Sequence, residues 1–126
     1  MRRSRLDNWI CSLEGLSEVT PENLESLQLE RLNSLLLRER ERGGFYSALP
    51  CRLESLSELA SLPFTTAEQL AENVSSMLLC SQAEVSRVIS GSTSGTTGPA
   101  KRVFYTRRDI EHIVGFFAAG IGEFVL

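Results

Sequence analysis

The apolar residues of the N-terminal third recur every three or four positions, as they do on one face of a helix. One such run begins at Leu6 and stops at Gly15, which predicts a short amphipathic helix. A longer run follows Thr20 and Pro21, which suit the cap and the first position of a helix, and it stops at Gly43. We therefore expect one short and one long helix before residue 44.

The C-terminal part carries the most regular helical pattern. Thr106 is a favourable N-cap, and Asp109 in the first turn complements the positive end of the helix dipole. The residues on the apolar face are Ile110, Ile113, Val114, Phe117, Ala118 and Ile121. His112 lies outside that face without a partner at metal-ligand spacing, so we expect an exposed residue with no catalytic or metal role.

The last residues, 123–126, are apolar after Glu123 and end without a cap, a turn or a polar tail. This ending predicts the start of another buried element whose partners are absent, and hence a fragment or one half of a split protein. The alternative is that residues 124–126 extend the preceding helix and pack back on it.

The segment after the long helix is less regular. The alternating charges of residues 38–42 predict a solvated helix end, because they create no field of a single sign. Residues 77–79 predict a short buried piece. Four leucines line a segment that leads to Pro63 and are expected to make core contacts: Leu53, Leu56, Leu59 and Leu62.

Two overlapping patterns can start a short helix in the middle of the chain. Thr65 with Glu68 forms a capping box. Thr66 with Gln69 forms an equivalent box one residue later. Either pattern predicts a helix that continues to about Asn73.

A segment rich in glycine, serine and threonine, residues 90–101, separates two short β-like stretches. Val85, Val88 and Ile89 precede it, and the apolar run 103–105 follows it. The segment is therefore predicted to join two strands and not to open a helix. Composition alone also fits a flexible linker, which is the alternative interpretation.

The chemistry of this loop is that of a phosphate site. Its glycines allow close approach of the backbone to a ligand, and successive N–H groups can form an anion-binding nest beside rotatable hydroxyls. Lys101, the only lysine of the chain, follows where an ammonium can reach a phosphate oxygen. The candidate ATP-binding residues are Thr93, Ser94, Gly95, Thr96, Thr97, Gly98 and Lys101.

Two common phosphate loops do not match this spacing. A P-loop requires Gly-Lys followed directly by Ser or Thr, whereas Gly98 is followed here by Pro99 and Ala100. A dinucleotide-binding fingerprint requires G-x-G, which is absent around the loop.

The run from Thr93 to Gly98 with Lys101 resembles the phosphate-binding signature of the adenylate-forming superfamily, which includes acyl-CoA synthetases. Residues 25–36, 44–46, 62–73 and 105–110 are similar, in order and approximate spacing, to the N-terminal part of phenylacetate-CoA ligases. One departure is that the family usually has Gly-Lys-Pro where this chain has Gly98, Pro99 and Ala100.

The resemblance implies an α/β fold that is incomplete in this chain. Residues 1–84 would form a helical N-terminal region, and residues 85–126 the start of an AMP-binding domain. The implied function is that of an ATP-dependent carboxylate-CoA ligase, which forms an acyl-adenylate and then an acyl-CoA thioester, with Mg²⁺ and coenzyme A. The substrate would be a small carboxylic acid, and aromatic acids are among the candidates. The 126 residues alone are expected to be inactive.

The alternative is a non-catalytic, truncated or split module. Such a chain would act by association with a C-terminal partner chain or with a second copy of itself.

Composition narrows the function further. The 126 residues have a formal net charge of -3 and no basic face, so a nucleic-acid-binding role is not expected. Cys11, Cys51 and Cys80 are far apart and lack C-x-x-C spacing, which predicts neither a disulfide framework nor a zinc site, and favours a reducing, cytoplasmic setting. No stretch is apolar enough for a signal peptide or a membrane span.

Three arginines lie near the loop in sequence, at Arg102, Arg107 and Arg108. Each either assists phosphate binding or points into solvent, as most charged side chains do. Ser94 lies in a G-S-T-S-G run that does not meet the G-x-S-x-G pattern of hydrolases. We therefore assign no catalytic residue.

Overall fold

The structure is a computed structural model that describes residues 3–91 and 101–125. Its helices are α1 (Arg5–Glu14), α2 (Pro21–Arg42), α3 (Ala67–Met77) and α4 (Arg107–Val125), with the short 3-10 helices η1 (Leu56–Ser61) and η2 (Gln82–Glu84). Two strands, β1 (Val85–Gly91) and β2 (Lys101–Thr106), form an antiparallel sheet. This mostly helical arrangement with one small sheet is consistent with part of the expected α/β fold.

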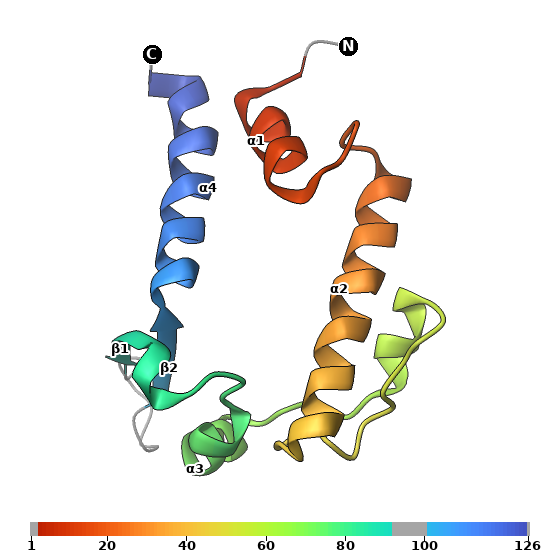
Figure 1. The fold of residues 1–126 in the computed structure, drawn as a ribbon, viewed down its shortest axis with the longest axis vertical. Coiled ribbons are helices and arrows are strands. Elements are labelled where there is room, and N and C mark those ends of the chain that lie inside the picture. The colour runs from red at the N-terminus through yellow and green to blue at the C-terminus, as the bar shows by residue number, and fades with distance from the viewer. Residues whose placement is uncertain (1–2, 92–100, 126) are drawn as a thin grey trace.

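Figure 1 shows how these elements are arranged. The long helices α2 and α4 stand apart from each other, and α1 lies between them at one end. Helix α3 and the strands lie at the opposite end. The start of α1 therefore lies beside the last turns of α4, where Arg5 contacts Glu123.

The predicted helix boundaries in the first third are confirmed. Ser4 and Asp7 form a capping box at the start of α1, and Gly15 ends it with φ of 70°. The Thr20 side chain accepts from the N–H of Asn23 at the start of α2. Gly43, with φ of 64°, ends α2 in the left-handed conformation that glycine adopts without strain.

The structure shows which of the two predicted capping boxes starts α3. The Thr66 hydroxyl accepts from the Gln69 N–H at 3.1 Å, and the Gln69 side chain accepts from the Thr66 N–H at 2.9 Å. The prediction that the helix ends near Asn73 is wrong. It continues to Met77 through a kink at Asn73, where φ is -116° and ψ is 15°.

The charged end of α2 differs from its prediction at one residue. Glu39 is only 3% exposed, although the run 38–42 was expected to be solvated. Its carboxylate accepts from the backbone N–H of Tyr46 at 3.3 Å, because the chain turns back at Gly44 and passes over it. A β-carbon at position 44 would overlap this carboxylate, so a larger residue there would displace the Glu39 side chain.

Polar side chains of α2 also hold the segment that follows it. Asn33 exchanges two hydrogen bonds with the backbone of Leu53, at 2.8 and 2.9 Å. Arg40 donates to the carbonyl oxygens of Ser47 and Leu49, at 3.0 and 2.9 Å. These two side chains of α2 thereby supply hydrogen-bond partners to backbone groups that lie outside helices and strands and would otherwise lack them.

The apolar core of the described residues is small. Its buried members are Leu36, Leu53 and Val74. Of the four leucines expected to make core contacts, Leu53 is buried and Leu56 and Leu62 are half-buried, whereas Leu59 is exposed. The predicted buried piece at residues 77–79 is half-buried, and its first residue belongs to α3.

Helix α1 packs on α4. The rings of Trp9 and Phe116 meet edge to face with centroids 6.2 Å apart. The Trp9 ring lies over Gly115, where a β-carbon would come within 3.0 Å of it. Arg5 adds a hydrogen bond from its backbone N–H to Glu123 at 2.6 Å and one from its side chain to the carbonyl oxygen of Gly122 at 2.9 Å.

Helix α4 begins as predicted, because Thr106 and Asp109 form reciprocal hydrogen bonds of 2.8 and 3.1 Å. It extends to Val125, so the prediction of a separate element at residues 123–126 is wrong for the described residues. The alternative, that residues 124–126 extend the helix and pack back on it, is correct only in its first part. Phe124 continues the helix but is 88% exposed and does not pack back on it.

Two further properties concern all described residues. Cys11, Cys51 and Cys80 are free thiols. In the part of the chain that the structure describes, no helix combines the length and the apolar character needed to cross a bilayer.

The α1–α4 contact predicts opposite effects for two glycines of the same helix. Gly115→Ala should lower the free energy of unfolding by about 1–3 kcal/mol, because its methyl group would press on the Trp9 ring. Gly120→Ala should raise it by up to about 1 kcal/mol, because nothing lies within 4 Å of its β-carbon and alanine favours the helix. Urea unfolding followed by Trp9 fluorescence measures both; equal effects would contradict this packing.

A second prediction concerns acid pH. The Ser4 backbone N–H donates to the Asp7 carboxylate at 3.0 Å, and this bond, with a smaller contribution from the Ser4 side chain, lowers the pKa of Asp7 below 3.8. Since the folded pKa is below the unfolded one, the resulting stabilisation of α1 is present above pH 3.8 and is lost as the pH falls through the folded value.

The measurement is a carbon-13 NMR titration of the Asp7 carboxyl group, whose midpoint should lie below 3.8. Ser4→Ala should raise the midpoint only in part, because the backbone donor remains. A midpoint at or above 3.8 in the folded chain would show that the capping bond is not formed.

Candidate functional site

The β1–β2 hairpin frames the predicted phosphate-binding loop. Val88 pairs with Phe104 and Ile89 with Val103, and Gly91 opposite Lys101 is the pair nearest the loop. The prediction that the loop joins two strands is thereby confirmed. The loop residues Thr93, Ser94, Gly95, Thr96, Thr97 and Gly98 lie outside the described residues.

Lys101 is the one candidate residue that the structure describes. It is the first residue of β2, it is exposed, and it stands at the point where the loop returns to the sheet. Because cross-strand neighbours lie about 5 Å apart, Gly91 and Lys101 hold the two ends of the segment 92–100 close together. An ammonium on a long flexible stem can reach a ligand above this hairpin mouth.

The three neighbouring arginines have different surroundings. The Arg102 guanidinium lies 5.8 Å from the centroid of the Phe104 ring, on the same face of its strand. Arg107 pairs with Glu111 at 3.0 Å, one turn along α4. Arg108 instead lines a cleft between the helices. Arg108 thus lines a cleft with α1 and α2 residues, and Arg107 and Arg108 both also line a second cleft beside the end of β2.

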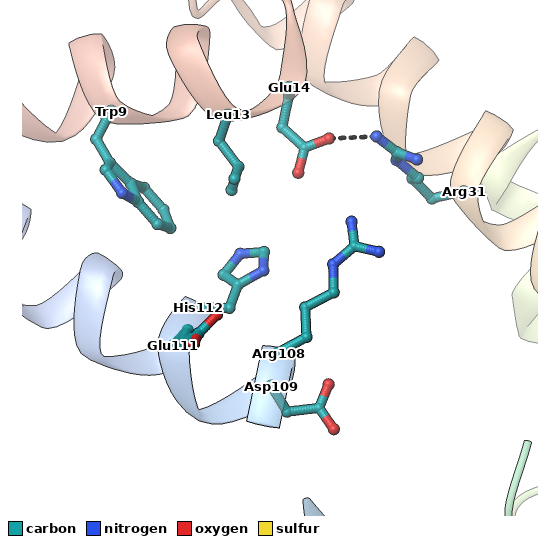
Figure 2. A pocket seen from close by; sticks show the side chains of 8 residues that line it. All are labelled: Trp9, Leu13, Glu14, Arg31, Arg108, Asp109, Glu111 and His112. Carbon is teal, nitrogen blue, oxygen red and sulfur yellow. Dashed lines mark hydrogen bonds and ion pairs between the residues drawn. The ribbon is translucent and has the colours of Figure 1, made fainter. Parts of the chain in front are cut away.

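This cleft, of about 720 Å³, lies between α1, α2 and the first turns of α4. Figure 2 shows Arg108 extending from α4 toward Glu14 and Arg31, with His112 beside it facing Trp9. Glu14 and Arg31 form an ion pair of 2.6 Å. The hydrogen bond to Glu14 raises the pKa of Arg31, so this guanidinium stays charged.

His112 contacts Trp9, which the sequence did not predict. Their ring centroids are 5.4 Å apart at an interplanar angle of 74°. The helical spacing correctly indicated that His112 is exposed and lies away from the predicted apolar face. The missing information was that α1 covers that other side of α4, and no local pattern in the sequence shows this.

A second cleft, of about 630 Å³, lies beside the end of β2 and is lined by residues of α2, η2 and α4. Glu84 on its wall accepts from the Ser81 N–H at 2.8 Å and from the Ser81 hydroxyl at 3.0 Å. These two bonds, followed by the charges of Arg42 and Arg38, lower the pKa of Glu84. Its carboxylate therefore remains ionised at neutral pH and acts as a cap.

The carboxylates of both clefts already have structural partners. Glu14 binds Arg31, Asp109 caps α4, and Glu111 pairs with Arg107. A general acid or base requires a carboxyl group within reach of a substrate proton. Among the described residues, these three carboxylates are therefore engaged in ion pairs and a helix cap.

Comparison with known proteins gives one result that bears on the family. No protein-family model matches the chain, and no solved structure matches it. A curated protein named phenylacetate-coenzyme A ligase, from Aromatoleum evansii, is 34% identical over 107 residues. The aligned part covers 79% of this chain and 24% of that relative, so the chain spans about a quarter of the relative's length. This match confirms the resemblance to phenylacetate-coenzyme A ligases that the sequence shows.

Proposed function

We propose that this chain supplies the ATP phosphate-binding segment of an ATP-dependent carboxylate-CoA ligase. Residues 85–126 would begin its AMP-binding domain, and residues 1–84 would form the helical region that precedes it. The observation that carries the proposal is the β1–β2 hairpin, whose closing pair sets Lys101 at the base of a segment rich in glycine and hydroxyl groups. The match to a named CoA ligase supports the reaction class.

The proposed reaction has two steps. A carboxylate oxygen of the acid attacks the α-phosphorus of ATP, the bond to the β-phosphate oxygen breaks, and pyrophosphate leaves with that electron pair. The thiol sulfur of coenzyme A then attacks the acyl carbon, AMP leaves, and the thiol proton passes to solvent. The acid would be small, and the name of the relative favours an aromatic one.

The contribution of this chain would be electrostatic. Charge builds on the departing pyrophosphate during the first step, and fixed donors stabilise it best when they are oriented in advance. Ser94, Thr96 and Thr97, with the N–H groups of Gly95 and Gly98, would hold the β- and γ-phosphates. Lys101 would neutralise part of the charge.

ATP reaches such an enzyme with Mg²⁺, but the metal is not assigned to residues of this chain. Within residues 3–91 and 101–125, no group of three or more His, Cys, Asp or Glu side chains is placed to hold an ion. Magnesium prefers oxygen ligands and keeps several waters beside phosphate oxygens. The free thiols at Cys11, Cys51 and Cys80 support the further proposal of a reducing, cytoplasmic setting.

The second candidate function is a non-catalytic module that acts by association. The specific observation in its favour is the exposed apolar side of α4, with Phe117 55% and Phe124 88% exposed. It predicts a partner-dependent oligomer and no dependence on ATP.

The ligase proposal predicts a specific loss on Lys101→Ala. The variant should weaken ATP binding to the chain by about 5- to 150-fold, which corresponds to the 1–3 kcal/mol of a hydrogen bond to a charged group. Isothermal titration calorimetry with ATP measures this. Pyrophosphate should compete with ATP for the site and AMP should not, because the loop is proposed to hold the β- and γ-phosphates.

Arg87→Ala is the matched control. Arg87 is an exposed cation of the same hairpin, but it pairs with Tyr105, away from the loop. It should leave ATP affinity within twofold. Equal losses in both variants, or competition by AMP as strong as that by pyrophosphate, would overturn the assignment of Lys101.

A further inference from the structure

Two arginines in the last turns of α2 bind a backbone group of a distant segment, although their side chains are exposed. Arg38 donates to the carbonyl oxygen of Leu79 at 3.3 Å, and Arg42 donates to the same oxygen. A carbonyl oxygen has two lone pairs and can accept both bonds. Residues four apart lie on one face of a helix, so both guanidinium groups approach Leu79 from the same side of α2.

Leu79 lies in the segment that leads from α3 into the hairpin. Between Leu79 and β1 the chain forms the short helix η2. The Glu84 carboxylate closes this turn, because it accepts from the Ser81 N–H at 2.8 Å and from the Ser81 hydroxyl at 3.0 Å. The next residue, Val85, starts β1 and pairs with Thr106 at the base of the hairpin. The Leu79 carbonyl is thus joined to the base of the hairpin through one closed turn.

The same two arginines lie near the base of the hairpin in other respects. The bonds from Ser81, and after them the charges of Arg42 and Arg38, lower the pKa of Glu84. Arg38 also lines the cleft beside the end of β2, together with Tyr105. In Figure 1, the last turns of α2, helix α3 and both strands lie at the same end of the molecule. The two guanidinium groups therefore lie between α2 and the start of the hairpin.

A hairpin turns a small tilt at its base into a larger displacement at its far end. Strand β1 has seven residues, and at about 3.3 Å per residue it extends roughly 20 Å. A tilt of about 10° at the base would therefore move the far end by ~3.5 Å. Lys101 lies at this far end, where it pairs with Gly91. A displacement of about 1 Å at a reacting centre can cost roughly a hundredfold in rate, so the orientation of the hairpin matters for Lys101.

We propose that Arg38 and Arg42 fix the orientation of the β1–β2 hairpin relative to α2 by binding the Leu79 carbonyl oxygen. They act as positioning residues for Lys101 and do not contact the ligand themselves. The effect on Lys101 rests on the proposed ligase function, whereas the orientation of the hairpin does not depend on it.

The first test requires no ligand. Residual dipolar couplings, measured by NMR in the intact chain, report the orientation of the strands relative to α2. In the variant Arg38→Ala/Arg42→Ala, the couplings of β1 and β2 should no longer fit the wild-type orientation. The couplings within α2 should still fit, which shows that the chain remains folded.

Arg40→Ala/Arg52→Ala is the matched control. It removes the same number of charges and also two backbone hydrogen bonds, those from Arg40 to the carbonyl oxygens of Ser47 and Leu49. Arg52 pairs with Glu54 at 3.5 Å. All of these partners precede α3 in the chain, so the hairpin should keep its wild-type orientation. Equal changes in the two double variants would overturn the proposal, because they would reflect a general loss of stability.

The second test is a double-mutant cycle with Lys101, measured by isothermal titration calorimetry with ATP. Removal of Arg38 and Arg42 should weaken ATP binding at least ~10-fold in the wild-type chain and less than ~3-fold in the Lys101→Ala chain. The second loss is smaller because there is no ammonium left to misplace. Losses that are equal in the two chains would overturn the positioning role, since the removal of two distant charges acts independently of Lys101.

The two tests separate this inference from the proposed function. A wild-type chain that does not bind ATP would contradict the ligase proposal, and the dipolar couplings would still decide whether the arginines orient the hairpin. If ATP binds and the Arg38→Ala/Arg42→Ala variant keeps the wild-type orientation of the hairpin, the proposed function stands and this inference is wrong.

Discussion

The contact of Trp9 with α4 is the interaction on which the arrangement of the chain depends. It joins the first helix to the last, across about a hundred residues of sequence, and the Trp9 ring lies so close to Gly115 that a β-carbon there would crowd it. On the other side of the molecule, order comes mainly from polar side chains of α2 that bind backbone groups of the following segment, as Asn33 and Arg40 do. With so few apolar side chains buried, these bonds carry much of the specificity of the fold.

The parts of this structure that the sequence predicted are those determined by neighbours along the chain. The caps at Thr20 and Thr106 and the glycine at position 43 each act within one helical turn, and all three were identified correctly. The strands on either side of the loop were predicted in the same way, from residues that are adjacent in the sequence. Such signals can be recognised in the sequence because hydrogen bonding at a helix end involves only the next three or four residues.

The errors arise where a distant segment decides the outcome. Glu39 looks solvated from its charged neighbours, yet it is buried because the chain folds back over it after Gly44. His112 was correctly predicted to be exposed, but its contact with Trp9 depends on where α1 packs. Of the candidate site, the hairpin and the position of Lys101 are described, and the roles of the loop residues stay predictions because residues 92–100 lie outside the description.

The register of the hairpin has a consequence for evolution and for ligand binding. Because Gly91 and Lys101 form the closing pair, a residue added or removed between them changes the length of the loop without shifting any strand pair. The strands also hold the two ends of the segment 92–100 together through their backbone pairing. The entropic cost of closing the segment 92–100 into a ring is therefore met by the sheet and does not oppose the binding of a ligand there.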